Sequence, residues 1–212
     1  MWLREITGKV YEGRKELGQD VIDLLKNEIR HLVEEGVKII QIDEPILSEV
    51  VFTNEKADNS FYWGALSEKV KVDKELKFAR ELLDPVLEEI RKHDGVLSIM
   101  HVCRGNWTTD ESVLLQGAYD KLGKFFDALD LDMLALEFST PRAGEVEKLF
   151  SNNFLDTRVM LGFGCINPRS EVIETPEEIV SRVEELLQFL PPERIWLNPD
   201  CGFATFAKRP LN

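Results

Sequence analysis

Two metal-competent side chains, His101 and Cys103, stand two residues apart near the middle of the chain. They follow the apolar run 96–100, and side chains two apart in a strand point to the same face. Glu137 and Cys201 follow two further apolar runs. One imidazole, two thiolates and one carboxylate are ligands that zinc accepts in tetrahedral geometry, and the thiolates argue against magnesium or calcium. The pattern predicts one zinc site.

Each of these residues also has a plainer interpretation. Free cysteine is among the residue types most often buried, so any of the thiols could simply pack in a core. A single His-x-Cys pair is weak support for a metal, and what favours zinc is the joint placement of four donors at strand ends. The chain has three cysteines, an odd number that argues against a disulfide framework. The third, Cys165, could lie near the zinc or pack.

The segments that would position these donors alternate between helix and strand. Apolar residues recur at helical spacing over four segments, 15–35, 66–92, 112–129 and 144–150. A fifth helix begins at Thr175, since Pro176 suits a first turn and Glu178 completes a capping box. Short apolar runs, typical of buried parallel strands, cover 37–42, 96–100, 133–136, 159–163 and 195–197. The alternation predicts an α/β fold with a parallel sheet of five units.

Polar and metal-competent residues follow every predicted strand, and this distribution favours one kind of parallel sheet. A (β/α) barrel of TIM type carries its site on the loops after all its strands, whereas a doubly wound sheet concentrates its site at one switch point. We therefore predict a barrel. A whole barrel takes eight units and roughly 250 residues, so five units predict a partial one. Nothing in the composition marks a linker or a repeat, and we expect residues 1–212 to form a single domain.

The charge of the chain excludes some classes of partner. Its 39 acidic and 26 basic side chains give a formal net charge of −13. This charge repels phosphate backbones and anionic membrane surfaces, so we expect neither nucleic acid nor a membrane as a partner. No stretch reaches the roughly 20 apolar residues of a membrane span, and residues 1–5 lack the apolar run of a signal peptide. The sequence predicts a cytoplasmic protein.

Four short segments resemble motifs of a known family. These segments are Gln41-Ile42-Asp43-Glu44-Pro45, His101-Val102-Cys103, Leu136-Glu137 and Asn198-Pro199-Asp200-Cys201-Gly202. In this order and at these separations they resemble the catalytic barrel of the cobalamin-independent methionine synthase family. The resemblance extends over about residues 38–203. It implies that the chain is the C-terminal portion of such a barrel, with strands four to eight.

The resemblance also implies an activity and a site. The family's zinc ligands correspond to His101, Cys103, Glu137 and Cys201, and its contact to the amino group of homocysteine corresponds to Asp43. The implied enzyme is a methyltransferase of the 5-methyltetrahydropteroyltriglutamate-homocysteine S-methyltransferase type, which makes methionine. From the residues alone, Asp43 could equally be a helix N-cap or part of a salt bridge at the rim.

Details of the resemblance leave the methyl donor and the acceptor thiol open. Residues 162–165, Gly-Phe-Gly-Cys, are similar to the short archaeal-type methionine synthases, which are thought to accept a methyl group from a corrinoid donor. Residues 101–106 and 142–144 are similar to relatives that include epoxyalkane coenzyme M transferase. Folate-using members carry a histidine near the end of the seventh strand, whereas residues 165–169 here have none. The donor stays open between folate and a corrinoid protein.

Several residues beside the predicted site have two interpretations. Glu44 could orient a ligand or be a solvated rim carboxylate, and Asp200 could hydrogen-bond a ligand or cap a turn. Asn106, with its neighbours Arg104 and Trp107, could form a donor surface or a plain surface loop. Residues 60–63, Ser-Phe-Tyr-Trp, could form a lid or a partner surface, or could pack in a core.

A partial barrel raises two alternatives to a complete methyltransferase. One is a zinc-binding half-barrel that is inactive without further strands. An open barrel exposes an edge strand and an apolar interior, which proteins normally cover, so we expect a homo-oligomer or a complementing chain. The other alternative is an alkyltransferase that acts on a different thiol, such as coenzyme M.

Overall fold

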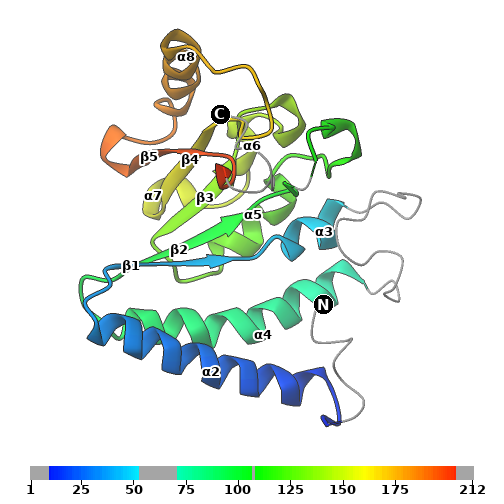
Figure 1. Ribbon diagram of the computed structural model, residues 1–212, viewed down its shortest axis with the longest axis vertical. Helices are drawn as coiled ribbons and strands as arrows, with labels where there is room; N and C mark the ends of the chain where they lie inside the picture. The colour runs from blue at the N-terminus through cyan, green and yellow to red at the C-terminus, as the bar shows by residue number, and fades with distance from the viewer. Residues whose placement is uncertain (1–9, 53–70, 107, 204–212) are drawn as a thin grey trace.

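The computed structural model of the protein describes residues 10–52, 71–106 and 108–203. Five parallel strands form one sheet in the order β1-β2-β3-β4-β5 (Figure 1), with bounds Ile39–Asp43, Leu97–Val102, Met133–Glu137, Met160–Ile166 and Ile195–Pro199. Strands that follow one another in the chain are neighbours in the sheet, and the order does not reverse. A doubly wound sheet reverses its strand order at the switch point, so this order is that of a (β/α) barrel.

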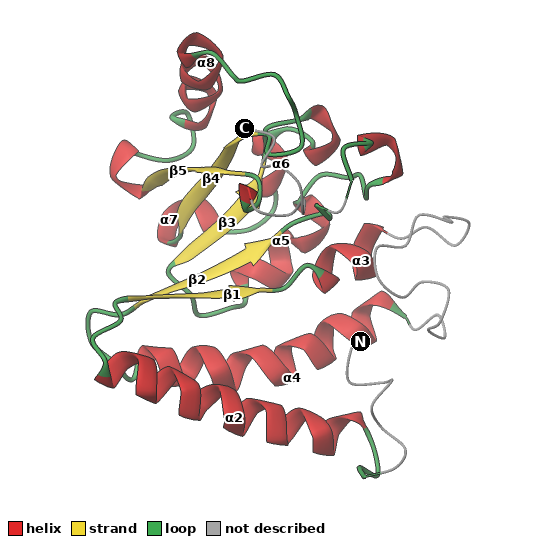
Figure 2. Cartoon of the chain, in the orientation of Figure 1, coloured by secondary structure: helices red, strands yellow, loops and turns green. Residues whose placement is uncertain are grey.

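Helices connect the strands, and in Figure 2 the long pair α2 and α4 runs side by side along the sheet. The described α-helices are α2 (Arg14–Glu34), α3 (Ile46–Phe52), α4 (Val72–Arg91), α5 (Asp120–Asp127), α6 (Val146–Leu149), α7 (Leu155–Arg158) and α8 (Pro176–Leu186). Three short 3₁₀ turns complete them, η1 (Glu111–Val113), η2 (Pro141–Ala143) and η3 (Pro192–Arg194). Among the helices of the described ranges, none is both long enough and apolar enough for a membrane span.

The core lies on one face of the sheet. Every described α-helix contributes apolar side chains to one cluster, together with alternate residues of the strands, such as Met100, Leu134 and Phe163. The opposite face carries a much smaller cluster of Ile99, Met133 and Ala135. Helices on one side of an unreversed parallel sheet are the arrangement of a TIM-type barrel, in which the second face points inward. The predicted fold class, a partial barrel of five units, is confirmed.

Local sequence signals explain where several elements begin and end. The hydroxyl of Thr175 accepts a hydrogen bond from the backbone N–H of Glu178 at 3.3 Å, and the Glu178 carboxylate accepts one from the backbone N–H of Thr175 at 2.8 Å. This is the predicted capping box at the start of α8. Gly36 follows the end of α2 with φ +90°, a left-handed conformation that glycine adopts without steric cost.

The predicted helix over 112–129 is wrong in its first half. The structure has the 3₁₀ turn η1 there, followed by a loop, and α5 begins at Asp120. Gly117 in this loop has φ +147°, and a Cβ at this position would collide with the ring of Phe52. Its carbonyl accepts two hydrogen bonds from the side chain of Arg104, at 2.5 and 3.0 Å. Tertiary hydrogen bonds therefore replace the helical ones. Residues 60–63, the start of the predicted helix over 66–92 and Trp107 lie outside the described residues.

Candidate metal centre

A cavity of about 760 Å³ opens on the inward face of the sheet. Polar residues from the carboxyl ends of β1, β2 and β5 line one part of it, while apolar side chains line the rest, among them Ile99, Met133 and Trp196. The carboxyl ends of parallel strands meet at the same edge of a sheet, which is where a barrel carries its site. Of the predicted ligands, His101, Cys103 and Cys201 line the cavity.

Three of the four predicted metal ligands meet at this edge. The donor atoms of His101, Cys103 and Cys201 all lie within 4.8 Å of one another, and Cys201 Sγ lies 3.5 Å from His101 Nε2. His101 Nδ1 lies 3.0 Å from the carbonyl oxygen of Ala135. Since a carbonyl only accepts, Nδ1 carries a proton and Nε2 is the nitrogen that faces the two thiols. Such a bond commonly orients a metal-binding histidine.

The donor set fits a zinc ion. Bonds of about 2.3 Å to sulfur and 2.1 Å to nitrogen, at tetrahedral angles, place a sulfur and a nitrogen roughly 3.6 Å apart. The observed separation between Cys201 Sγ and His101 Nε2 is 3.5 Å. Two thiols and an imidazole are soft or borderline donors, which suit zinc better than magnesium or calcium.

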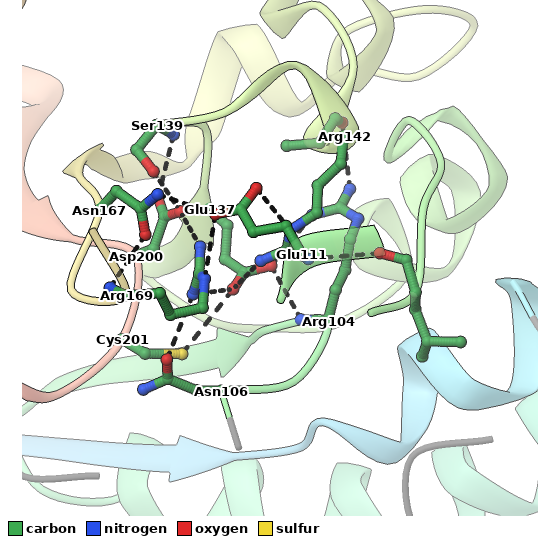
Figure 3. A network of polar contacts seen from close by, with 12 residues as sticks. Arg104, Asn106, Glu111, Glu137, Ser139, Arg142, Asn167, Arg169, Asp200 and Cys201 are labelled. Atoms are coloured by element: carbon green, nitrogen blue, oxygen red, sulfur yellow. Dashed lines mark hydrogen bonds and ion pairs between the residues drawn. The ribbon is translucent and has the colours of Figure 1, made fainter. Parts of the chain in front are cut away.

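Glu137, the fourth predicted ligand, lies at the border of this group. Its Oε1 is 3.8 Å from Cys201 Sγ, and the residue is 1% exposed. Three arginines hold its carboxylate (Figure 3): Arg104 through its backbone N–H at 2.8 Å, Arg142 Nη2 at 3.3 Å and Arg169 Nη1 at 3.5 Å. The structure therefore brings together three donors and places the carboxylate beside them, shared with a buried cationic cluster.

Without a metal, the pKa values of the three donors differ strongly from the usual values of histidine and cysteine. Burial would lower the pKa of His101, but its hydrogen bond to Cys103 and the nearby negative charges raise the pKa to about 9. A hydrogen bond from Cys201 lowers the pKa of Cys103 to about 5, against the effect of burial. The same bond raises the pKa of Cys201. One thiolate is thus already formed at neutral pH, while the second thiol and the imidazole each keep a proton that a metal would displace.

Asp200, the residue before Cys201, ties the end of β5 to the loop after β3. Its carboxylate accepts hydrogen bonds from the backbone N–H groups of Phe138 and Ser139 at 3.1 and 3.0 Å, from Ser139 Oγ at 2.5 Å and from Arg169 Nη2 at 2.9 Å. Burial, helped by the charge of Glu137, raises the pKa of Asp200 to about 6. The Asp200 carboxylate lies directly against the backbone of Gly164 in β4. This contact requires glycine, because a Cβ at position 164 would stand 2.6 Å from Asp200 Oδ1.

The remaining predicted site residues lie in three different settings. Asp43 is exposed at the end of β1, lines the cavity and accepts a hydrogen bond from Gln41 Nε2 at 2.7 Å. Glu44 is partly buried, its backbone N–H donates to the carbonyl of His101 at 2.9 Å, and burial raises the pKa of its carboxyl to about 7. Asn106 lines the cavity and donates from Nδ2 to the carbonyl of Gly202 at 3.2 Å.

Cys165 lies on the other face of the sheet. It is 2% exposed within the core cluster between sheet and helices, and its thiol contacts the carbonyl oxygen of Asn198 at 3.7 Å. Burial raises the pKa of this thiol. Of its two interpretations, the structure places it in the packed core, whereas the other two cysteines face the cavity.

Sequence reasoning missed the side chains that surround the donors. Arg104, with its guanidinium 3.8 Å from the ring centre of Tyr119, is fully buried and so forms no part of a donor surface. The Tyr119 hydroxyl donates to the carbonyl of Val102 at 2.6 Å and accepts from the backbone N–H of Glu137 at 3.2 Å, which joins the ends of β2 and β3. Arg104, Arg142 and Arg169 follow predicted strands by four to six residues, but no local signal distinguishes them from solvated arginines.

Comparison with known proteins identifies the family of this chain. The family model described as "Cobalamin-independent synthase, Catalytic domain" matches residues 11–77 and 100–210. Among curated proteins, a methionine synthase from Saccharolobus solfataricus is 28% identical over 199 residues, which cover 94% of this chain and 48% of that protein. One from Sulfurisphaera tokodaii is 29% identical, with 94% and 46% covered. The chain thus spans about half the length of the curated relatives it matches.

Two solved structures share the fold. A B12-independent methionine synthase from Shewanella sp. W3-18-1, in complex with selenomethionine, superposes with a TM-score of 0.66 and 19% identity over 94% of this chain and 52% of that chain. A putative vitamin-B12-independent methionine synthase from Listeria monocytogenes gives 0.62 and 18%, over 90% and 50%. With more than half of the chain matched by the family model, the protein belongs to the cobalamin-independent methionine synthase family.

Proposed function

We propose that the chain carries the zinc site of a thiol methyltransferase of methionine synthase type, which transfers a methyl group to homocysteine. The observation that supports this most is the meeting of His101, Cys103 and Cys201 at the edge of a cavity large enough for an amino acid. A zinc ion held there, with Glu137 as its fourth donor, would lower the pKa of an incoming thiol and favour its thiolate.

The protein's own side chains prepare this site in three ways. The Ala135 carbonyl fixes the ring of His101, so that Nε2 faces the two thiols and can bind a metal once its proton is displaced. Cys103 supplies a thiolate without a further proton loss at neutral pH. The apolar wall formed by Ile99 and Met133 keeps water away from the sulfur and the methyl group. The homocysteine sulfur then forms a bond to the methyl carbon, while the electron pair of the broken bond leaves with the donor.

Asp43 favours homocysteine over coenzyme M as the acceptor. Its exposed carboxylate lines the cavity beside Gln41, where it would bind the ammonium group of homocysteine by a charge-assisted hydrogen bond. Coenzyme M instead carries a sulfonate, which this carboxylate would repel. The methyl donor is proposed to be a folate or a corrinoid protein, and nothing in the cavity favours one of them.

Metal content and sulfur coordination test the proposal. Wild type should contain one zinc per chain by elemental analysis, and Cys201→Ser should lose it. Cys165→Ser is the matched control, because Cys165 lies on the opposite face of the sheet, and it should keep its zinc. On titration with homocysteine, X-ray absorption at the zinc edge should then show one additional sulfur ligand.

Two results would count against the proposal in different ways. Zinc that does not respond to homocysteine would favour the inactive half-barrel, or a different thiol if coenzyme M competes for the site. Protein purified without chelators that contains no zinc would disprove the metal centre itself.

A further inference from the structure

The side chain of Arg169 is buried at the centre of the polar network in Figure 3. Its guanidinium contacts four partners: Nη2 lies 2.9 Å from Asp200 Oδ2, Nη1 lies 3.5 Å from Glu137 Oε1 and 3.3 Å from Asn106 Oδ1, and Nε lies 3.3 Å from Glu111 Oε1. The side chain is 0% exposed. Every nitrogen of this guanidinium therefore has an acceptor within the protein.

These partners belong to different strand-end segments. Asn106 and Glu111 follow β2, Glu137 ends β3, and Asp200 follows β5, while Arg169 itself follows β4. The proposed donors come from the same places, because Cys103 follows β2 and Cys201 follows Asp200. One planar group thus connects the segment that carries Cys103 with the segment that carries Cys201.

The contact between Arg169 and Glu137 bears most directly on the metal. Glu137 Oε1 is shared between the guanidinium at 3.5 Å and Cys201 Sγ at 3.8 Å. Asp200 and Glu137 are both buried carboxylates, and they repel one another unless a cation lies between them. In a buried setting this repulsion is screened little by water or salt. Arg169 contacts both carboxylates, so its loss would leave their repulsion opposed only by the bonds that each carboxylate keeps to other groups, and Cys201 is the direct neighbour of Asp200.

We propose that Arg169 is the positioning residue of the metal centre, which sets the distance between Glu137 and Cys201 by holding Glu137 and Asp200 on one guanidinium. This inference rests on the zinc site proposed above. Arg169 contacts neither the substrate nor the ion in this role. It acts through the two carboxylates, and its effect is on the affinity and the geometry of the bound metal.

Arg169→Lys is the most informative variant, because it keeps the positive charge and much of the volume. Lysine is a point charge that lacks the planar fork, so it cannot hold Asp200, Glu137 and Glu111 in one plane. Arg182→Lys is the matched control. Arg182 lies in α8, in the same βα unit, and its Nη1 donates to the carbonyl of Cys165 at 2.8 Å, on the core face.

Cobalt(II) is the probe, because its visible absorption reports coordination geometry and its thiolate charge-transfer bands report sulfur ligation. Arg169→Lys should bind cobalt about 10-fold to 100-fold more weakly than wild type in chelator competition, the usual range when a group that orients metal ligands is lost. Its visible bands should change in shape. Glu111→Gln, which removes the negative charge from one anchor of Arg169, should weaken binding several-fold. Arg182→Lys should match wild type.

The outcomes separate this inference from the proposed function. Folded Arg169→Lys with wild-type affinity and spectrum would overturn the positioning role while leaving the metal site intact. An equal loss in Arg182→Lys would show general destabilisation and would also overturn it. If Arg169→Lys does not fold by circular dichroism, Glu111→Gln decides, and unchanged affinity there overturns the inference. A wild type that binds no cobalt would remove the metal site and this inference together.

Discussion

His101, Cys103 and Cys201 share protons in a way that makes metal binding depend on pH. At neutral pH the metal-free site holds one proton on His101, whose pKa is about 9, and one on Cys201, whose pKa is raised. Cys103, with a pKa of about 5, has already lost its proton. A metal displaces both remaining protons, so zinc affinity should rise with pH by about 100-fold per unit between pH 6 and 8, tenfold for each proton.

Chelator competition at several pH values measures this dependence once the chelator's own titration is subtracted. Cys165→Ser should show the same slope as wild type, since Cys165 does not face the donors. An affinity that stays flat over this range would show that the two protons are absent from the metal-free site.

The carboxylate of Asp43 should decide which thiol the cavity prefers. Asp43→Asn keeps the size of the side chain but removes its charge, so homocysteine affinity should fall about tenfold to a hundredfold, the value of a charge-assisted hydrogen bond. Isothermal titration of the zinc-loaded protein measures it. The matched ligand is 4-mercaptobutanoate, which is homocysteine without its amino group, and its affinity should not fall. Equal losses for both ligands would contradict the ammonium contact.

The meeting of His101, Cys103 and Cys201 could be predicted from residue types, whereas the side chains around them could not. Histidine, cysteine and glutamate are all ligands that zinc accepts, and their joint placement at strand ends predicted His101, Cys103, Glu137 and Cys201 as the ligands. A buried arginine such as Arg169 looks the same in a sequence as the solvated arginines that are far more frequent. The proposed role follows from three carboxylates and one amide that three separate segments place around it, and no local pattern records that convergence.

At the scale of elements, ion pairs join the two long helices, and one of them involves the buried carboxylate of Glu89. Arg30 in α2 donates to the Glu89 carboxylate in α4 at 2.7 Å, and Lys92 adds a second contact at 2.9 Å. The hydrogen bond from Arg30, acting against burial, lowers the pKa of Glu89 to about 2. The Glu89 carboxyl has a lower pKa in the folded state than in the unfolded state, so its ionised form stabilises the fold above about pH 5. That stability is lost as the pH falls from 5 towards 2.

Glu89→Gln should therefore reduce the pH dependence of the free energy of unfolding on the acid side. Thermal unfolding between pH 3 and pH 7 measures this dependence, and wild type should gain more stability than the variant as the pH rises. Glu88→Gln, at the neighbouring exposed position, is the control and should follow wild type. A variant curve parallel to that of wild type would mean that the ion pair does not couple to folding.

Strands proved easier to predict than the helices between them. All five predicted strands are present, because short apolar runs between turn residues admit little else. The segment 112–129 has helical periodicity, yet its first half is a loop whose backbone is bound by Arg104 and Arg142. Likewise, the single helix predicted over 144–150 is followed by a second short helix, α7. Periodicity reports which side chains are buried, but it does not report what the backbone binds.

At the scale of the whole molecule, the inward face of the sheet has exposed apolar side chains at both edges among the described residues. Within the described residues β1 and β5 each pair with one strand, and Ile39 on β1 and Trp196 on β5 are 48% and 42% exposed. Apolar surface beside an unpaired strand edge promotes association. We therefore predict that the 212-residue chain forms a dimer or a larger assembly, unless a complementing chain occupies these edges.

Light scattering coupled to size-exclusion chromatography measures the mass of the assembly. Ile39→Glu, which places a charge on this face, should shift the population towards the monomer. Val172→Glu is the control at a position that is 75% exposed in the loop after β4, and it should leave the mass unchanged. A clean wild-type monomer would contradict the prediction.

The division of the three cysteines between the two faces of the sheet has a practical consequence. A filled metal centre would shield Cys103 and Cys201 from alkylating reagents, and removing the ion would release both. Cys165 would react in neither state, because only unfolding reaches it. Counting alkylated thiols by intact-protein mass spectrometry would therefore report the occupied fraction in a mixed sample, molecule by molecule. The number of alkylated thiols would thus measure metal occupancy, and this measurement would need no methyl donor.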